Sequence, residues 1–225
     1  MKEIILDLCG GTGSWSLPYK EDGYDVRVIT IPEYDVRTYV LPDEPIYGIL
    51  AAPPCTMFSY ARTRSTRPRD LREGMEIVAA CLDLVWEAQN RLDSDQQKYS
   101  PLGFWALENP YYGMLSWFLG KPAFVFDPWE FGDAYKKRTA IWGKFNEPVK
   151  THKNIIEVMT PEQIEKHKTN SQALPKFDRM RSKDIHFEYF GKLDRSARRA
   201  ITPKGFSQAF FKANSLSAVE LVDLS

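Results

Sequence analysis

The segment Ile4-Ile5-Leu6-Asp7-Leu8 is a short apolar run that leads directly into Cys9-Gly10-Gly11-Thr12-Gly13. An apolar run of this length is typical of a buried parallel strand, and the glycines after it predict a tight turn into a helix. Such a turn lets the backbone approach a ligand closely and presents amide donors to it. No Gly-Lys-Ser/Thr follows, so the turn is not a phosphate-binding P-loop. Asp7 suits a ligand that carries a positive charge or hydroxyl groups.

The rest of the chain predicts strands that alternate with helices. Apolar side chains recur at three- and four-residue steps over 70–90, which predicts an amphipathic helix with Cys81 in the core. We therefore expect an α/β fold, with a mostly parallel sheet and helices on both faces. The strand that precedes Glu108 is expected to end before that residue. The expected strands, rich in apolar and β-branched residues, are 4–8, 25–31, 46–52, 103–107, 123–126 and 139–142.

Polar residues follow several of these strands. Asp7, Asp35 and Cys55 lie near the ends of three strands, and Glu108-Asn109 follows a fourth. Ligands of parallel α/β sheets bind at the carboxyl ends of the strands. The coincidence predicts an active site at this edge of the sheet.

Cys55 is the candidate nucleophile. The pair Pro53-Pro54 fixes the direction of the chain, so that the Cys55 side chain projects in a defined way. Segment 62–72 then carries five arginines against one aspartate, a net charge of +4. Neighbouring cations lower the pKa of a thiol and favour the thiolate. The five arginines, which we expect to contact a polyanion, are Arg62, Arg64, Arg67, Arg69 and Arg72.

Glu108 is the candidate acid. It emerges from an apolar strand, and partial desolvation keeps a carboxyl protonated more readily. A thiolate beside a proton-donating carboxyl suits attack on an electron-poor ring.

Taken in order, these motifs resemble the DNA cytosine-C5 methyltransferase family, most of all its compact, phage-type branch. Segment 7–13 is similar to the family's first AdoMet motif, and Asp35-Val36 resembles the pair that meets the adenine amino group. Ala52-Pro53-Pro54-Cys55 resembles the nucleophile motif, and Glu108-Asn109 the Glu-Asn motif that engages cytosine N3. Lys136-Lys137-Arg138 resembles the basic motif that contacts the cytosine.

The resemblance implies a Rossmann-like, AdoMet-dependent methyltransferase sheet that binds duplex DNA with a flipped cytosine. Cys55 would add to C6 while Glu108 protonates or hydrogen-bonds N3, and C5 would take the methyl group of S-adenosyl-L-methionine. The implied catalytic residues are Cys55, Glu108, Asn109 and Arg138, the last of which holds the carbonyl O2. The implied cofactor residues are Asp7, Cys9, Gly10, Gly11, Thr12, Gly13, Trp15, Glu33, Asp35, Pro53 and Asn214. The implied DNA contacts are the five arginines of 62–72.

Two positions depart from the family pattern. Cys9 stands where the family has an aromatic residue, so stacking on adenine is expected from Trp15. Thr30 stands where an acidic residue is expected at the end of the second strand, and Glu33 is the nearest substitute for binding the ribose.

The sequence divides into three expected parts. Residues 1–144 are expected to form the AdoMet-binding catalytic domain, and 198–225 to return to it, with segments that resemble the two C-terminal motifs. Residues 145–197 are a small insert that we interpret as a reduced target-recognition region. Within it, 161–168 predict one short helix with Thr160 as its N-cap.

Composition excludes several classes of protein. The 225 residues, 43% hydrophobic and 27% charged, predict one packed domain with a small appendage. No apolar run reaches the roughly 18 residues of a membrane span, and the first residues predict no signal peptide. Three scattered cysteines fit a reducing cytosol, so we expect a cytoplasmic protein of a prokaryotic or phage-infected cell. The histidines at 152, 167 and 186 have no metal-ligand spacing, so no metal is expected.

Two other functions stay open. One is a catalytically impaired, methyltransferase-like DNA-binding protein, which Cys9 and Thr30 favour. The other is a pyrimidine-C5 methylase acting on RNA or nucleotides. The net charge of zero favours a nucleotide, whereas the local basic segments argue against it. Adenine-N6 chemistry is disfavoured because Cys55, not an aromatic residue, follows the proline pair.

Overall fold

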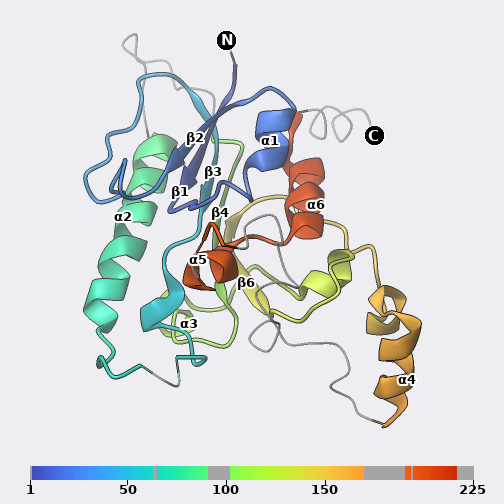
Figure 1. Ribbon diagram of the computed structural model, residues 1–225. Helices are drawn as coiled ribbons and strands as arrows, with labels where there is room; N and C mark the ends of the chain where they lie inside the picture. The colour runs from blue at the N-terminus through green and yellow to red at the C-terminus, as the bar shows by residue number, and fades with distance from the viewer. Residues whose placement is uncertain (1, 63–64, 91–101, 170–190, 194, 217–225) are drawn as a thin grey trace.

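The computed structural model describes residues 2–62, 65–90, 102–169, 191–193 and 195–216 (Figure 1). These residues form a six-stranded sheet in the order β2-β1-β3-β4-β6-β5. The strands are β1 (Ile4–Leu8), β2 (Asp25–Ile29), β3 (Ile46–Ala51), β4 (Phe104–Pro110), β5 (Phe124–Phe126) and β6 (Thr139–Lys144). The α-helices are α1 (Leu17–Glu21), α2 (Leu71–Asn90), α3 (Ser116–Leu119), α4 (Pro161–Thr169), α5 (Arg195–Ala200) and α6 (Lys204–Asn214). The 3-10 turns are η1 (Cys55–Met57), η2 (Pro128–Phe131) and η3 (Ile155–Val158).

The sheet is mostly parallel, as expected, but β6 makes it a mixed sheet. β1 pairs in parallel with β2 and β3, and β3 with β4, whereas β6 runs antiparallel to both β4 and β5. The connection from β5 to β6 contains the short turn η2 and no α-helix. Because a parallel neighbour usually needs a crossover helix, the chain turns back here and β6 pairs antiparallel with β5.

β4 is longer than the sequence predicts. It does not end before Glu108 but continues to Pro110, because β6 pairs with it along that stretch, with Glu108 opposite Ile141 and Asn109 opposite Ala140. Pairing with β3 stops earlier, at Leu107. Glu108 and Asn109 therefore lie within a strand, yet beyond the end of the neighbouring parallel strand.

Helices cover both faces of the sheet, as expected (Figure 1). α2 packs on one face, and its Cys81 is fully buried in a cluster of mainly aliphatic side chains. α1 and α6 cover the other face, where the core is mostly aromatic. Phe126 and Phe206 stack there with ring centroids 3.9 Å apart, so α6 is fixed to the sheet by aromatic contacts.

The order in which successive strands join the sheet reverses at β1. The chain goes from β1 to β2 on one side and then returns to β3 on the other side of β1. Ligands of open α/β sheets bind outside the carboxyl ends of the strands at such a switch point. The loop that follows β1 contains the glycine turn, and the loop that follows β3 contains Cys55.

The short helix expected in the insert is present as α4. The side chain of Thr160 accepts a hydrogen bond from the amide of Gln163, and the side chain of Gln163 accepts one from the amide of Thr160. This reciprocal pair is a capping box, so the N-cap is confirmed. The rest of the expected insert includes 170–190, which lies outside the described residues. No helix among the described residues is both long enough and apolar enough to cross a membrane.

Candidate active site

The buried Asp7 side chain packs directly against the glycine turn. Its carboxyl group is fully buried, and its Oδ2 accepts a hydrogen bond of 2.6 Å from the Ser16 hydroxyl. Burial raises the pKa of Asp7 to about 6, although the bonds from Ser16 oppose the shift. A Cβ at Gly10 would lie 2.4 Å from the Asp7 carboxyl carbon, so only glycine fits over this side chain. Asp7 thus shapes the turn, and its expected contact with the cofactor stays a prediction.

The glycine turn itself is open to solvent. Gly11 and Thr12 are exposed, and Gly11 has a φ of 55° with no atom within 4 Å of a hypothetical Cβ. Ser14 directly follows the glycine turn, and its hydroxyl accepts a hydrogen bond of 2.9 Å from the Thr202 amide. The segment before α6 therefore braces the turn, which leaves the backbone at Gly11 free to face a ligand.

Cys9 begins the turn with a positive φ of 56°, a conformation that non-glycine residues rarely adopt. Its thiol forms a hydrogen bond with the thiol of Cys81 on α2, and this bond lowers the pKa of Cys9. The Cys9 side chain thus packs toward α2 and the core beneath the turn. Its sulfur supports the turn from the α2 face.

The Cys55 loop is tied to β4 by a buried hydrogen bond. Asn109 is fully buried, and its Nδ2 donates to the carbonyl oxygen of Pro53 over 3.0 Å. Asn109 therefore positions the Cys55 loop, and its expected role at the reacting base stays a prediction. Cys55 is partly exposed and begins the turn η1. The bond brings the Cys55 loop and the Glu108-Asn109 strand to one edge of the sheet.

Arg69 holds the other side of the Cys55 loop. Its two terminal nitrogens donate to the carbonyl oxygens of Met57 (2.9 Å) and Ser59 (2.8 Å). These bonds give Arg69 a structural role, while its expected phosphate contact stays a prediction. Its guanidinium places a fixed positive charge next to η1.

The pKa of the Glu108 carboxyl group is raised, as the sequence predicts for a proton donor. Burial raises the pKa of its carboxyl group, and the positive charge of Lys137 only partly offsets this effect. A carboxyl group with a raised pKa keeps its proton to a higher pH and can donate it to a ring nitrogen.

The Arg138 side chain contacts Asp127 and Tyr111, the residue directly after β4. Its Nη1 lies 3.2 Å from Asp127 Oδ2, and its guanidinium carbon lies 5.6 Å from the centre of the Tyr111 ring. The side chain remains 41% exposed, so one edge of the guanidinium faces solvent. Of the basic motif, Lys137 acts on Glu108, whereas Arg138 stands over Tyr111.

Two expected cofactor residues belong to the core instead. Trp15 is 2% exposed, with the rings of Phe206 and Phe210 5.9 and 5.4 Å away. It lies on the α6 side of the sheet and offers no face to adenine, which corrects that expectation. Asn214 is also buried, and its side-chain amide bonds to both the amide and the carbonyl of Asn146 and to the carbonyl of Phe210. Its role is to anchor the end of α6.

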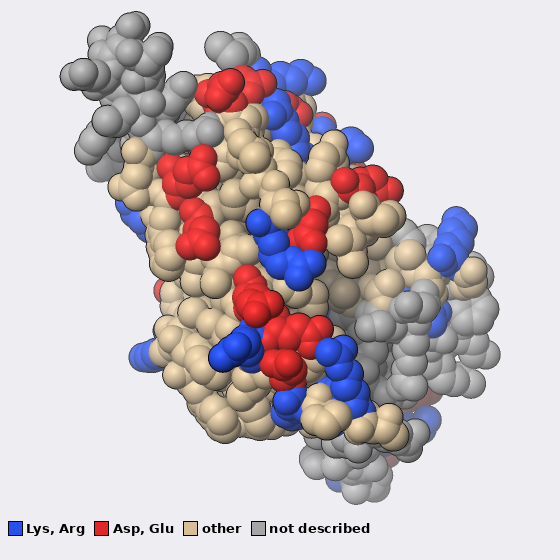
Figure 2. All heavy atoms as spheres, turned by 90° about the vertical axis from the view of Figure 1, so that its left-hand side faces the viewer, with Lys and Arg blue, Asp and Glu red and all other residues tan. Residues whose placement is uncertain are grey.

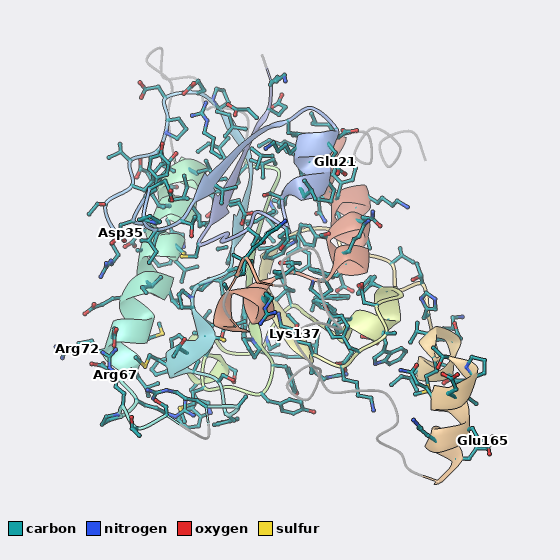
Figure 3. The ribbon with its side chains drawn as sticks, viewed as in Figure 1. Glu21, Asp35, Arg67, Arg72, Lys137 and Glu165 are labelled. Atoms are coloured by element: carbon teal, nitrogen blue, oxygen red, sulfur yellow. The ribbon has the colours of Figure 1, made fainter. Side chains whose placement is uncertain are left out.

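Glu33 and Asp35 lie in the loop after β2. Glu33 is exposed, and the Asp35 carboxylate is held on both oxygens by Arg37. This bonding lowers the pKa of Asp35 to about 2. Asp35 lies beside α2 (Figure 3), and its charge acts on Cys9, so the two loops are neighbours. An adenine amino group would have to share the carboxylate with Arg37.

The arginine segment is less uniformly basic than its sequence suggests. Arg67 pairs with Glu73 over 2.7 Å, and Arg62 donates to the carbonyl of Arg67. Arg64 lies outside the described residues. Over α2, basic and acidic side chains alternate on the surface (Figure 2). Arg67 and Arg72 lie together at one end of α2, at the side of the molecule (Figure 3).

Two other features bear on ligands. In the part of the chain that the structure describes, no group of three or more His, Cys, Asp or Glu side chains could hold a metal ion. A surface hollow is lined by Lys2, Lys20, Tyr24 and Arg27, at the amino ends of β1 and β2. It lies at the opposite end of these strands from Cys55, and no expected site residue lines it.

The glycine turn, the Pro53-Pro54-Cys55 loop and Glu108-Asn109 thus lie at one edge of the sheet. Trp15 and Asn214 lie in the core instead. Sequence reasoning missed the roles of Ser16, which holds Asp7, and Tyr111, which lies under Arg138. No local motif marks either residue, because both act through contacts with residues distant in the sequence.

No protein-family model matches the chain, and no curated protein matches it either. The proposed function therefore rests on the chain's own motifs and geometry.

Replacing both Arg67 and Arg72 by glutamine tests the arginine segment as a DNA contact. Each arginine that neutralises a phosphate of a duplex contributes about 0.9 to the slope of log affinity against log salt concentration. We expect the double variant to flatten that slope by about 2 in a titration with a short duplex, while Lys20→Gln, on the exposed part of α1, leaves it unchanged. An unaltered slope would show that the segment is only a charge-balanced surface.

Proposed function

We propose that the chain methylates cytosine at C5 in DNA, using S-adenosyl-L-methionine and a covalent bond between Cys55 and cytosine C6. The observation that carries the proposal is the Asn109 to Pro53 hydrogen bond of 3.0 Å. It holds a partly exposed cysteine beside a strand whose Glu108 has a raised pKa. A positioned thiol and a protonated carboxyl are the two groups that addition to a pyrimidine ring requires.

The edge of the sheet also suits the cofactor. The exposed turn at Gly11 and Thr12, the acidic loop at Glu33 and Asp35, and Pro53 follow three adjacent parallel strands. The open space at Gly11 leaves room for an adenosyl group, and the carboxylates suit its hydroxyl and amino groups. When bound there, S-adenosyl-L-methionine supplies an electrophilic methyl group to C5.

The chain's own residues perform the remaining chemistry. The Cys55 thiolate forms a bond to C6 as the C5–C6 double bond opens, and Glu108 donates a proton to N3. Electron density moves to C5, which makes that carbon a nucleophile. Once C5 carries the methyl group, loss of the C5 proton to solvent restores the C5–C6 double bond and expels the thiolate, and N3 returns its proton to Glu108. Arg138, partly exposed, is suited to hold the O2 carbonyl.

A second candidate is a DNA-binding protein of the same fold without turnover. The burial of Trp15 favours it, because neither Trp15 nor Cys9 provides an aromatic face for adenine. The two candidates differ in whether a methyl group is transferred.

Incubation of the full chain with tritiated S-adenosyl-L-methionine and DNA, RNA or free nucleotides, followed by base analysis, tests the proposal. We expect tritium in 5-methylcytosine from DNA. Cofactor binding without transfer to any substrate would favour the second candidate, and label in RNA or a nucleotide would overturn the choice of DNA.

A further inference from the structure

Five exposed aromatic side chains gather next to the Cys55 loop. They are carried by residues 58–60 and by the loop and helix α3 that follow β4. We call this set the aromatic ledge. Its members, with their exposed fractions, are Tyr60 (47%), Tyr111 (43%), Tyr112 (64%), Trp117 (66%) and Phe118 (47%).

Backbone contacts make the ledge one unit with the nucleophile loop. Ser59 forms a β-bridge with Gly113, and the Tyr60 amide donates to the Tyr112 carbonyl over 3.2 Å. The Met114 amide donates to the Phe58 carbonyl over 3.0 Å, one residue after η1. The two segments therefore cannot shift independently of the turn that carries Cys55.

The charge of the segments that carry the ledge favours a negatively charged partner. Neither 55–69 nor 109–119 contains an acidic residue, and the first contains four arginines, of which Arg67 pairs with Glu73 on α2. Arg138 stands over the Tyr111 ring at the edge of the ledge. Within 55–62, 65–69 and 109–119, every large exposed hydrophobic side chain is aromatic. Aromatic rings interleaved with arginine are typical of surfaces on which the bases of single-stranded nucleic acid stack.

We infer that the aromatic ledge binds single-stranded DNA by stacking on unpaired bases next to the target cytosine. In a duplex the faces of each base are covered by its neighbours, so flat exposed rings gain little from it. The choice of DNA rests on the proposed function, which this inference deepens: the favoured substrate is cytosine in an unpaired strand.

The test compares affinities of the full chain for fluorescein-labelled oligonucleotides by anisotropy. The probes are a thymidine 12-mer, an abasic 12-mer with the same phosphates, a 12-base-pair duplex and a uridine RNA 12-mer. We expect the thymidine strand to bind most tightly. Tyr112→Ala and Trp117→Ala should each weaken its binding about fivefold or more, and leave binding of the abasic strand unchanged, because only stacking is lost.

Two controls make the result specific. Trp86→Ala removes another exposed aromatic side chain, 52% exposed on α2, and should bind every probe like wild type. Tyr112→Phe keeps the ring and should retain binding. Equal affinity for the abasic and thymidine strands, tighter binding of duplex or RNA, or equal losses on both DNA strands would each overturn the inference. Formation of the Cys55 adduct is measured separately, so the inference can fail while the proposed function stands.

Discussion

Glu108→Gln is expected to lower the rate of methyl transfer by about 10²- to 10⁴-fold, because the glutamine amide cannot deliver a proton to N3. In the wild type, activity should fall as pH rises through the raised pKa of Glu108, since only the protonated carboxyl is competent. The variant should lack this limb of the pH profile. Single-turnover rates measured between pH 5 and 9 provide the comparison, with the exposed Glu21→Gln as the matched control.

Stability provides an independent check on Glu108. Its pKa is raised above the ordinary 4.5 in the folded chain, so the folded state holds the proton more tightly than the unfolded one. Its contribution to the free energy of unfolding therefore declines as pH rises from the unfolded value through the folded one. Glu108→Gln should lose this decline and be at least as stable as wild type at pH 8. A variant that is both active and less stable would show that Glu108 is a structural residue.

Asn109→Ala is expected to slow reaction at Cys55 by about 10- to 100-fold, because a misplaced nucleophile loses the benefit of orientation. The change removes the bond to the Pro53 carbonyl and leaves that buried oxygen without its donor. We expect a loss of about 1–3 kcal/mol in the free energy of unfolding as well. Denaturant titration and single-turnover kinetics measure the two effects.

Asn214→Ala is the matched control for Asn109. It also removes a buried amide that joins two distant segments, but at the end of α6. It should lower stability by a similar amount while the rate and the affinity for S-adenosyl-L-methionine stay near wild type. If Asn214→Ala weakened cofactor binding, its expected cofactor role would be restored. If the two variants lost the same activity, the Asn109 effect would reflect stability alone.

Much of the fold follows from local sequence patterns. The strands 4–8 and 46–52, the helix 70–90 and the Thr160 cap are signalled by residues close to them in the chain, and the structure places them there. The antiparallel β6 and the extension of β4 could not be predicted in this way. Both depend on pairing between segments about thirty residues apart, which no local pattern encodes.

The candidate site was predicted where chemistry and strand ends coincide, as at Cys55 and Glu108. Predictions for side chains in loops and near the C-terminus were weaker. Trp15 turns into the core because α6 supplies Phe206 and Phe210 on that face. Arg69 turns to the carbonyl groups of Met57 and Ser59, which lie twelve and ten residues earlier in the chain. Tertiary packing decides the direction of these side chains, so a motif alone does not fix where they point.

The central claim, covalent attack by Cys55, is tested most directly with DNA that contains 5-fluorocytosine. Fluorine at C5 cannot leave as the C5 proton does, so an attacking thiolate stays bound to C6. In the presence of S-adenosyl-L-methionine we expect a protein–DNA adduct that survives denaturation, with Cys55 identified as the linked residue by mass spectrometry. Cys81→Ala should form the adduct and Cys55→Ala should not. An adduct that persists in Cys55→Ala, or none with the wild type, would contradict the account.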